Sequence, residues 1–177
     1  MTLSNEYARA LFALAQEDER TDAVLDELKA VARVLAENPP YISLLSTPSL
    51  KKEQKLALID EAFASLSEYT LNTLKLLCER RLISIIPEVT KAYEVIFDKV
   101  NGITRVIAET AVPMSDSQMA ALKLKLEREL GGNVIIVNEV EKAMLGGVKL
   151  RYSGLQIDGS VKTRLDKLAS GIKSVIL

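Results

Sequence analysis

Few residues of this 177-residue chain are of types that could do chemistry. The sequence has no histidine and one cysteine, Cys78. Without histidine, neither a Ser-His nor a Cys-His catalytic pair can form, and one cysteine cannot supply the usual ligands of a zinc site. A single cysteine also excludes an internal disulfide, which fits a reducing compartment. Lysine chemistry and carboxylate-only chemistry remain open.

A glycine pair and two carboxylates are the next candidates. Gly146-Gly147, in AMLGGVKLRYSG, could present backbone N–H groups to a phosphate. No Lys-Ser or Lys-Thr follows the pair, and a strand pattern comes next, so we interpret it as a turn or a close backbone approach in a sheet. Glu139 and Glu141 lie in a predicted loop without a visible partner, and we interpret them as surface residues.

Two basic clusters could bind an anion. They are Arg80-Arg81, which follows Lys75, and Lys51-Lys52 with Lys55. A solvated surface is the simpler interpretation of both, since cations at a helix C-terminus complement the helix dipole. Cys78 lies on the apolar side of its predicted helix, so we interpret it as a small core or groove residue rather than a reactive thiol.

The composition favours a folded helical protein. Apolar residues make up 48% of the chain, charged residues 27% and aromatic residues only 5%. The net charge is -1, with 12 Lys/Arg against 16 Asp/Glu in residues 1–103 and 11 against 8 in residues 104–177. That balance does not indicate nucleic-acid binding. The N-terminus lacks a signal-peptide pattern, and no apolar run approaches the ~18 residues of a membrane span.

Helical spacing of apolar residues runs through the first hundred positions. Val24, Leu28 and Val31 share one helix face, and Asn38-Pro39-Pro40 ends that helix because proline cannot continue the hydrogen-bond ladder. Such short helices need each other for stability, so we expect a six-helix bundle. The predicted helices cover about Ser4–Glu17, Thr21–Glu37, Tyr41–Leu45, Lys51–Phe63, Glu68–Arg80 and Ile83–Val100, with Ser4 as the first N-cap and Pro87 in the first turn of the last helix.

The pattern changes after the turn signal Asn101-Gly102. Alternating residues predict a strand over about 106–112, and the capping box Ser115–Gln118 opens a helix that ends at Gly131-Gly132. Strands over about 134–137, 148–152 and 155–157 follow, and Asp158 or Ser160 caps a final helix. We therefore predict a mainly α protein: a six-helix bundle over residues 1–102 and a small α+β domain over residues 103–177.

Two predicted helices carry unusually wide apolar arcs. A bundle helix usually buries a stripe of somewhat more than ~100°. On a wheel of 100° per residue, the apolar residues of the first and fifth helices each cover roughly 200°. One side can serve the bundle and the other a partner helix, although both helices could equally be central and covered by neighbours. The arcs comprise Tyr7, Ala8, Ala10, Leu11, Phe12, Leu14 and Ala15 in the first helix, and Tyr69, Leu71, Leu74, Leu76, Leu77 and Cys78 in the fifth.

Two motifs resemble the delta subunit family of bacterial and chloroplast ATP synthases, which includes the mitochondrial oligomycin sensitivity-conferring protein. Tyr7-Ala8-Arg9-Ala10-Leu11-Phe12 is similar to the family's opening helix. Val137–Gly154 resembles its C-terminal signature and is followed by Ile157-Asp158-Gly159-Ser160-Val161 and Arg164-Leu165. Leu74-Lys75-Leu76-Leu77 and Pro87-Glu88 also fit. Leu82 departs from the basic residue that family members often carry nearby, which puts a charge contact there in doubt.

The resemblance implies a non-catalytic stator subunit without cofactor or metal, present as one copy per complex. It implies that the bundle binds the N-terminal helix of an alpha subunit in a groove between the first and fifth helices, and that the C-terminal region meets the peripheral-stalk b subunits. The chain would lie peripherally on the cytoplasmic face of the cell membrane, without inserting into it. The groove residues are expected to be Tyr7, Ala10, Leu11, Leu14, Leu74, Leu77 and Cys78, and the architectural residues Gly146, Gly147, Asp158 and Gly159.

Two other functions compete with this one. A helical adaptor outside ATP synthase would show the same bundle, and only the C-terminal signature separates the two. An RNA-binding module fits the mixed, basic C-terminal half, but the sequence has no aromatic-rich strand, GxxG-plus-basic loop or strong basic stripe.

Overall fold

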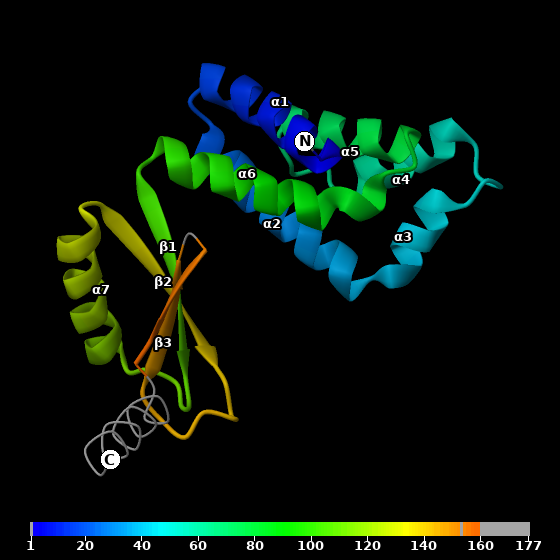
Figure 1. The fold of residues 1–177 in the computed structure, drawn as a ribbon. Helices are drawn as coiled ribbons and strands as arrows, with labels where there is room; N and C mark the ends of the chain where they lie inside the picture. Colours follow the sequence, from blue (N-terminus) through cyan, green and yellow to red (C-terminus); the bar gives the residue numbers. More distant parts are fainter. Residues whose placement is uncertain (1, 153, 160–177) are drawn as a thin grey trace, which may run out of the picture. The chain divides into compact units, whose positions relative to one another are not determined.

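The computed structural model describes residues 2–152 and 154–159 (Figure 1). The chain is mainly helical and carries a small four-stranded sheet. It divides into two compact units, of which the second begins at Asp98. That position lies inside the last helix before the sheet, a few residues ahead of the turn at Asn101-Gly102 where we predicted the domain boundary.

The helices that precede the sheet begin and end close to the predicted positions. The N-cap of α1 is Thr2 rather than Ser4, so the helix starts two residues earlier than that cap predicts. α3 also starts earlier, because Pro39 and Pro40 occupy its first turn, where a missing N–H is tolerated. The bounds are α1 (Leu3–Glu17), α2 (Thr21–Glu37), α3 (Pro39–Ser46), α4 (Lys52–Ala62), α5 (Glu68–Glu79) and α6 (Ile86–Val100), with the 3-10 turn η1 (Ile83–Ile85) ahead of α6.

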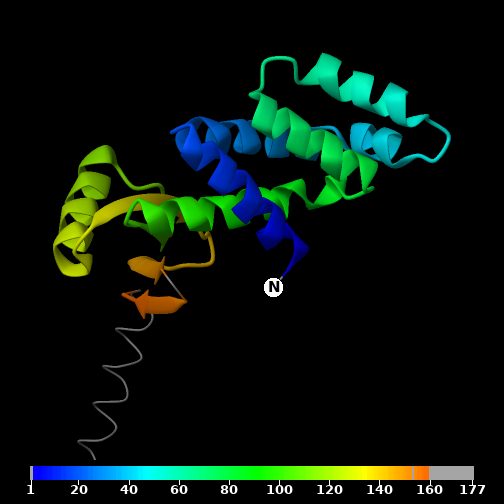
Figure 2. The ribbon, with the colours of Figure 1, turned by 90° about the horizontal axis from the view of Figure 1, so that it is seen from above.

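Tyr93 joins three helices of the first unit. Its side chain is fully buried, and its ring meets Phe12 of α1 edge to face, with 5.3 Å between the ring centroids. Its hydroxyl donates to the Thr21 carbonyl at the start of α2, at 3.2 Å. Burial, with smaller contributions from nearby carboxylates, raises the pKa of the Tyr93 phenol. Figure 2 shows α1 lying across α6, the arrangement that this contact holds in place.

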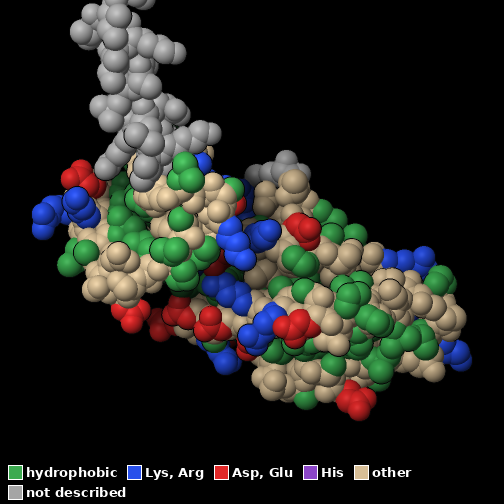
Figure 3. All heavy atoms as spheres, turned by 90° about the horizontal axis from the view of Figure 1, so that it is seen from below, with side chains coloured by type: hydrophobic (Ala, Val, Ile, Leu, Met, Phe, Trp, Pro, Cys, Tyr) green, Lys and Arg blue, Asp and Glu red, His purple; other side chains and the backbone are tan. Residues whose placement is uncertain are grey.

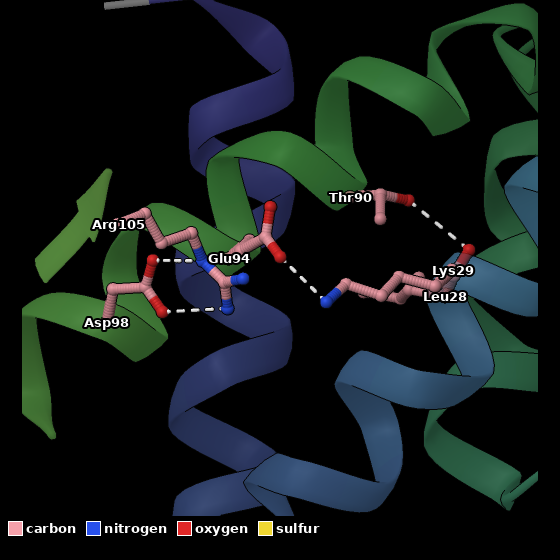
Figure 4. Close-up of polar contacts among 6 residues, drawn as sticks. All are labelled: Leu28, Lys29, Thr90, Glu94, Asp98 and Arg105. Carbon is pink, nitrogen blue, oxygen red and sulfur yellow. Dashed lines mark hydrogen bonds and ion pairs between the residues drawn. The ribbon is translucent and has the colours of Figure 1, made fainter. Parts of the chain in front are cut away.

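Polar contacts fix α6 at two further points (Figure 4). The Thr90 hydroxyl lies 2.9 Å from the Ile86 carbonyl and 3.4 Å from the Leu28 carbonyl, and Lys29 pairs with Glu94 at 2.7 Å, so α2 and α6 are joined by their side chains. Near the end of α6, Asp98 accepts two hydrogen bonds from Arg105, at 2.5 and 3.0 Å. This bidentate pair connects the end of the helix to the first strand.

The second unit is built around a βαβ unit. β1 (Ile103–Thr110) pairs in parallel with β2 (Asn133–Val140), and α7 (Asp116–Leu130) crosses between them. β3 (Val148–Tyr152) pairs antiparallel with β1 and with β4 (Leu155–Asp158), giving the order β2-β1-β3-β4. The predicted capping box is present, because Ser115 and Gln118 exchange hydrogen bonds at the start of α7. The predicted final helix lies outside the described residues.

One face of the sheet packs against α7, which lies along it in Figure 1. The buried residues of this core, within the described part of the chain, are Val106, Ala108, Leu126, Val134 and Leu150. Ion pairs also join three of the strands: Arg151 of β3 pairs with Glu109 of β1 at 3.1 Å and with Glu139 of β2 at 3.6 Å. Our placement of Glu139 in a loop without a partner was wrong, because the parallel register of β1 and β2 continues as far as Val140.

Asn138 completes the sheet unit's polar contacts. Its side-chain nitrogen donates to the Ala108 carbonyl and the Thr110 hydroxyl, both at 2.8 Å. Its side-chain oxygen accepts from the Met114 N–H at 2.9 Å. One amide therefore fastens β2 to β1 and to the loop that leads into α7.

Candidate interaction surfaces

The two sides of α1 have different surroundings. Ala8, Leu11, Phe12 and Ala15 are buried in the helical unit. Four other residues, spaced so that they share one side of the helix, form what we call the α1 strip: Leu3, Tyr7, Ala10 and Leu14. Leu3 is 45% and Leu14 48% exposed, Ala10 is exposed and Tyr7 is half-buried. The wide arc predicted for this helix thus divides into a core side and an accessible side.

α5 divides in the same way and packs beside α1. Leu74, Leu77 and Cys78 are buried, whereas Leu76 is 42% exposed. The Tyr69 hydroxyl donates to the Asp18 carboxylate just after the end of α1, and this hydrogen bond raises the pKa of the phenol. The bond ties the start of α5 to the end of α1. The α1 strip with Tyr69 and Leu76 is called the α1–α5 surface below.

The structure divides the seven residues predicted to line the groove. Tyr7, Ala10 and Leu14 reach the α1–α5 surface. Leu11, Leu74, Leu77 and Cys78 lie beneath it, each no more than 3% exposed, so they support the surface and a bound partner would not reach them. The core of the helical unit takes one side of each arc, and the predicted residues included members of both sides. Leu3 also lies on this surface and was not among the predicted residues, although its place four residues before Tyr7 signals the same side of the helix.

Glu27 of α2 positions α5 and was also missed. Its carboxylate accepts from the Ser67 N–H at 2.9 Å and from the hydroxyls of Ser67 and Thr70, both at 2.5 Å. Ser67 is the N-cap residue of α5. A carboxylate at this position satisfies donors that a helix start leaves unpaired and complements the helix dipole. Because Glu27 and Ser67 are 40 residues apart, no local pattern indicates the contact.

The architectural residues predicted from the C-terminal motif lie around the start of β3. Gly147 has φ +87°, a conformation that side chains other than glycine rarely adopt, and Gly146 precedes it. The Gly159 N–H donates to the Val148 carbonyl at 3.0 Å, and a Cβ at Gly159 would lie only 3.0 Å from the same oxygen. Asp158, the last residue of β4, pairs with Lys149 in the sheet register. These residues therefore let β3 and the end of β4 approach closely.

Charged and hydrophobic side chains are mixed on the one face that Figure 3 draws. On the face drawn in Figure 3, acidic and basic side chains lie interspersed among hydrophobic ones. A mixed face of this kind differs from the basic stripe typical of nucleic-acid-binding surfaces. Within residues 2–152 and 154–159, no helix combines the length and apolar character needed to cross a bilayer.

The chain matches a family model and several curated bacterial proteins over nearly its whole length. Residues 3–172 match the model of the ATP synthase delta (OSCP) subunit. The chain is 35% identical to "ATP synthase subunit delta" of Clostridioides difficile (strain 630) over 98% of this chain and 97% of that protein. It is also 35% identical to the protein of the same name from Geobacillus sp. (strain WCH70), over 94% of each chain.

A solved structure has the same fold. A chain in the cryo-EM structure of the Toxoplasma gondii mitochondrial ATP synthase hexamer superposes with a TM-score of 0.71. The alignment covers 97% of this chain and 98% of that one, at 23% identity. Structural similarity at 23% identity shows a shared fold only, whereas the family match and the curated relatives show membership of a family. The chain belongs to the ATP synthase delta (OSCP) subunit family.

Proposed function

We propose that this chain is the tie in the stator of an F-type ATP synthase, joining the catalytic head to the peripheral stalk without catalysing a reaction itself. Its membership of the delta family supports the stator role over that of a helical adaptor outside ATP synthase or an RNA-binding module. A tie of this kind keeps the head from turning with the rotor. Torque then drives conformational change in the head.

The α1–α5 surface carries the finer proposal, that the six helices act as one bundle and bind the N-terminal helix of an alpha subunit. Leu3, Leu14 and Leu76 are large apolar side chains exposed on two adjacent helices. The small Ala10, exposed in the middle of the α1 strip, would allow a partner helix to approach closely. An amphipathic helix laid against such a surface buries its own apolar stripe. Anchoring by a few well-packed apolar residues is typical of tight interfaces.

We assign the second unit to the C-terminal ends of the b subunits. Its described core is small, and β3 and β4 form an edge hairpin of the sheet. The chain would then lie peripherally on the cytoplasmic face of the cell membrane, one copy per complex, anchored through the b subunits.

Titration calorimetry of the full chain with a peptide from the alpha-subunit N-terminus of the same organism tests the head contact. Ala10 and Ala13 form a matched pair, because both are exposed alanines of α1 but only Ala10 belongs to the α1 strip. We expect Ala10→Asp to weaken binding about tenfold or more, which corresponds to about 1.4 kcal/mol. Ala13→Asp should bind nearly as the wild type does, and the circular dichroism of both variants should be unchanged.

Two results would contradict the assignment. Unchanged peptide affinity in a folded Ala10→Asp protein would remove the α1–α5 surface from the interface. Equal losses in both variants would show that acidic charge anywhere on α1 repels the peptide, so the surface would have no specific role. A negative heat-capacity change in the wild type would support burial of apolar surface.

A further inference from the structure

A small hollow lies between the beginning of α4 and the C-terminal end of α5, away from the residues of the α1–α5 surface. Its volume is about 190 Å³. Three cationic side chains line it, Lys52, Lys55 and Arg81, against one carboxylate, Glu79, and the thiol of Cys78 lies there too. The two basic clusters that we interpreted as separate solvated surfaces therefore meet at one place.

Lys55 lacks a counter-charge in this hollow. The residue is only 8% exposed, yet none of the described residues forms a hydrogen bond or ion pair with its ammonium group. No described side-chain nitrogen is both buried and unpaired, so the Lys55 ammonium group remains accessible to solvent, and therefore to an anion. The neighbouring lysines are paired, Lys52 with Glu79 at 3.0 Å and Lys75 with Asp60 at 2.5 Å. Lys55 is the lysine of this group that an anion in the hollow would neutralise.

Arg81 reaches the hollow from a strained backbone position. Its φ is +59°, and it occupies the C′ position of a Schellman motif at the end of α5. The Arg81 N–H donates to the Cys78 carbonyl at 3.0 Å, and the Leu82 N–H to the Leu77 carbonyl at 2.7 Å. Glycine is the usual residue at C′ because a Cβ is unfavourable there. Strain of this kind gathers at functional sites, and here it occurs at a residue that lines the same hollow as Lys55.

We propose that this hollow binds a small oxyanion of the phosphate type, with Lys55 and Arg81 as its charge partners. Pockets for drug-sized ligands measure about 300–1,000 Å³, so this hollow suits an inorganic anion and is too small for a nucleotide. Arginine and lysine are the side chains that bind phosphate groups most readily. The first turn of α4, which begins at Lys52, adds the positive end of a helix dipole.

Cys78 gives this site a reporter within the natural sequence. It is the sole cysteine, so a thiol reagent modifies one position. Burial raises the pKa of its thiol, while the nearby Lys55 acts in the opposite direction. Alkylation should therefore be slow in the free protein, and an anion in the hollow should slow it further.

The test is an NMR titration of the full chain with inorganic phosphate at constant ionic strength. We expect saturable shifts of the backbone amides around Lys55 and Arg81, and slower alkylation of Cys78 by iodoacetamide as phosphate is added. Lys55→Met, which retains the apolar stem and removes the charge, should weaken phosphate binding at least tenfold. Lys52→Met should weaken it less, because Lys52 is already paired with Glu79.

Matched variants separate site binding from general salt effects, since phosphate stabilises folded proteins by exclusion from their surface. Lys91→Met removes an exposed lysine of α6 outside the hollow and should titrate as the wild type does. Lys55→Arg retains the charge and should retain binding. Identical titrations of the wild type and Lys55→Met, or shifts scattered over the surface, would overturn the proposal. Acetate binding as tightly as phosphate would overturn the assignment to a phosphate-type anion.

Discussion

The two units differ in how their cores are built. Every helix from α1 to α6 contributes at least one buried residue to the first unit, and Leu28, Leu74 and Tyr93 have no exposed surface at all. The described part of the second unit buries five hydrophobic residues, and two of them, Leu126 and Leu150, retain some exposure. Polar contacts add to its stability, chiefly the Asn138 amide and the pair between Asp98 and Arg105.

This difference bears on the partner surface that we propose for α1. The inner side of α1 is anchored by Leu11 and Phe12 in the dense core, so its outer side is held in place before any partner arrives. Surfaces that are ordered in advance lose less entropy on binding. The sheet unit has less apolar burial to hold a comparable surface rigid. The largest effects of substitution should therefore appear in the helical unit.

The largest expected effect comes from a matched pair of core truncations. Leu74→Ala empties a fully buried site in α5, whereas Leu126→Ala truncates a residue of α7 that is 8% exposed. We expect a loss of about 3–5 kcal/mol for Leu74→Ala and about 2–3 kcal/mol for Leu126→Ala, because the cost rises with the cavity that remains. Amide hydrogen exchange of the full chain assigns each loss to its own unit. Equal losses would contradict the contrast between the two cores.

The next effect concerns the carboxylate that caps α5. Glu27→Ala removes an acceptor of three hydrogen bonds from Ser67 and Thr70. We expect a loss of about 2 kcal/mol, the range for hydrogen bonds to charged groups and for helix caps. Asp26→Ala, at the exposed neighbouring position of α2, is the control and should change stability little. Chemical denaturation followed by circular dichroism measures both, and similar effects of the two variants would refute the capping role.

The smallest effects compare helix ends in the two units. Arg81 and Gly131 both follow a helix with a left-handed backbone, at φ +59° and +70°. Arg81→Gly relieves strain and should raise the stability of the helical unit by about 0.5 kcal/mol, while Gly131→Ala should lower that of the sheet unit by about 1 kcal/mol. Thermal unfolding combined with amide hydrogen exchange measures the stability change of each unit separately. A loss of stability in Arg81→Gly would mean that contacts of the arginine side chain outweigh the strain.

Local signals sufficed for most of the element pattern. Asn38-Pro39-Pro40 marks the end of α2, and the capping box at Ser115 marks the start of α7, because each acts through neighbours along the chain. The succession of one strand, a helix and three further strands along the chain follows from the same kind of signal, whereas the order of the strands in the sheet was not predicted. The contacts by which residues join one element to another do not follow from local signals. Glu27 and Asn138 contact groups 24 to 43 residues away, so nothing adjacent to them indicates their partners.

The candidate site was predictable only in outline. The width of the apolar arcs indicated that α1 and α5 have two apolar sides, and the structure gives each helix a buried and an accessible side. Which side is which depends on the neighbouring helices, and a wheel drawn from one helix cannot show that. Leu11 and Leu14 therefore looked equivalent, although one is buried and the other is half exposed. The meeting of Lys55 with Arg81 in one hollow depends on the packing of α4 against α5 in the same way.

The contact between Phe12 and Tyr93 also has a consequence for folding during synthesis on the ribosome. In the growing chain, Phe12 of α1 cannot pack against Tyr93 until α6, the last helix of the unit, has been synthesised. At a synthesis rate of ~5–20 residues per second, this interval lasts several seconds. Throughout that time the nascent α1 presents apolar residues on both of its sides. During this interval α1 is therefore a segment that a chaperone at the tunnel exit could bind, and the emergence of Tyr93 would favour its release.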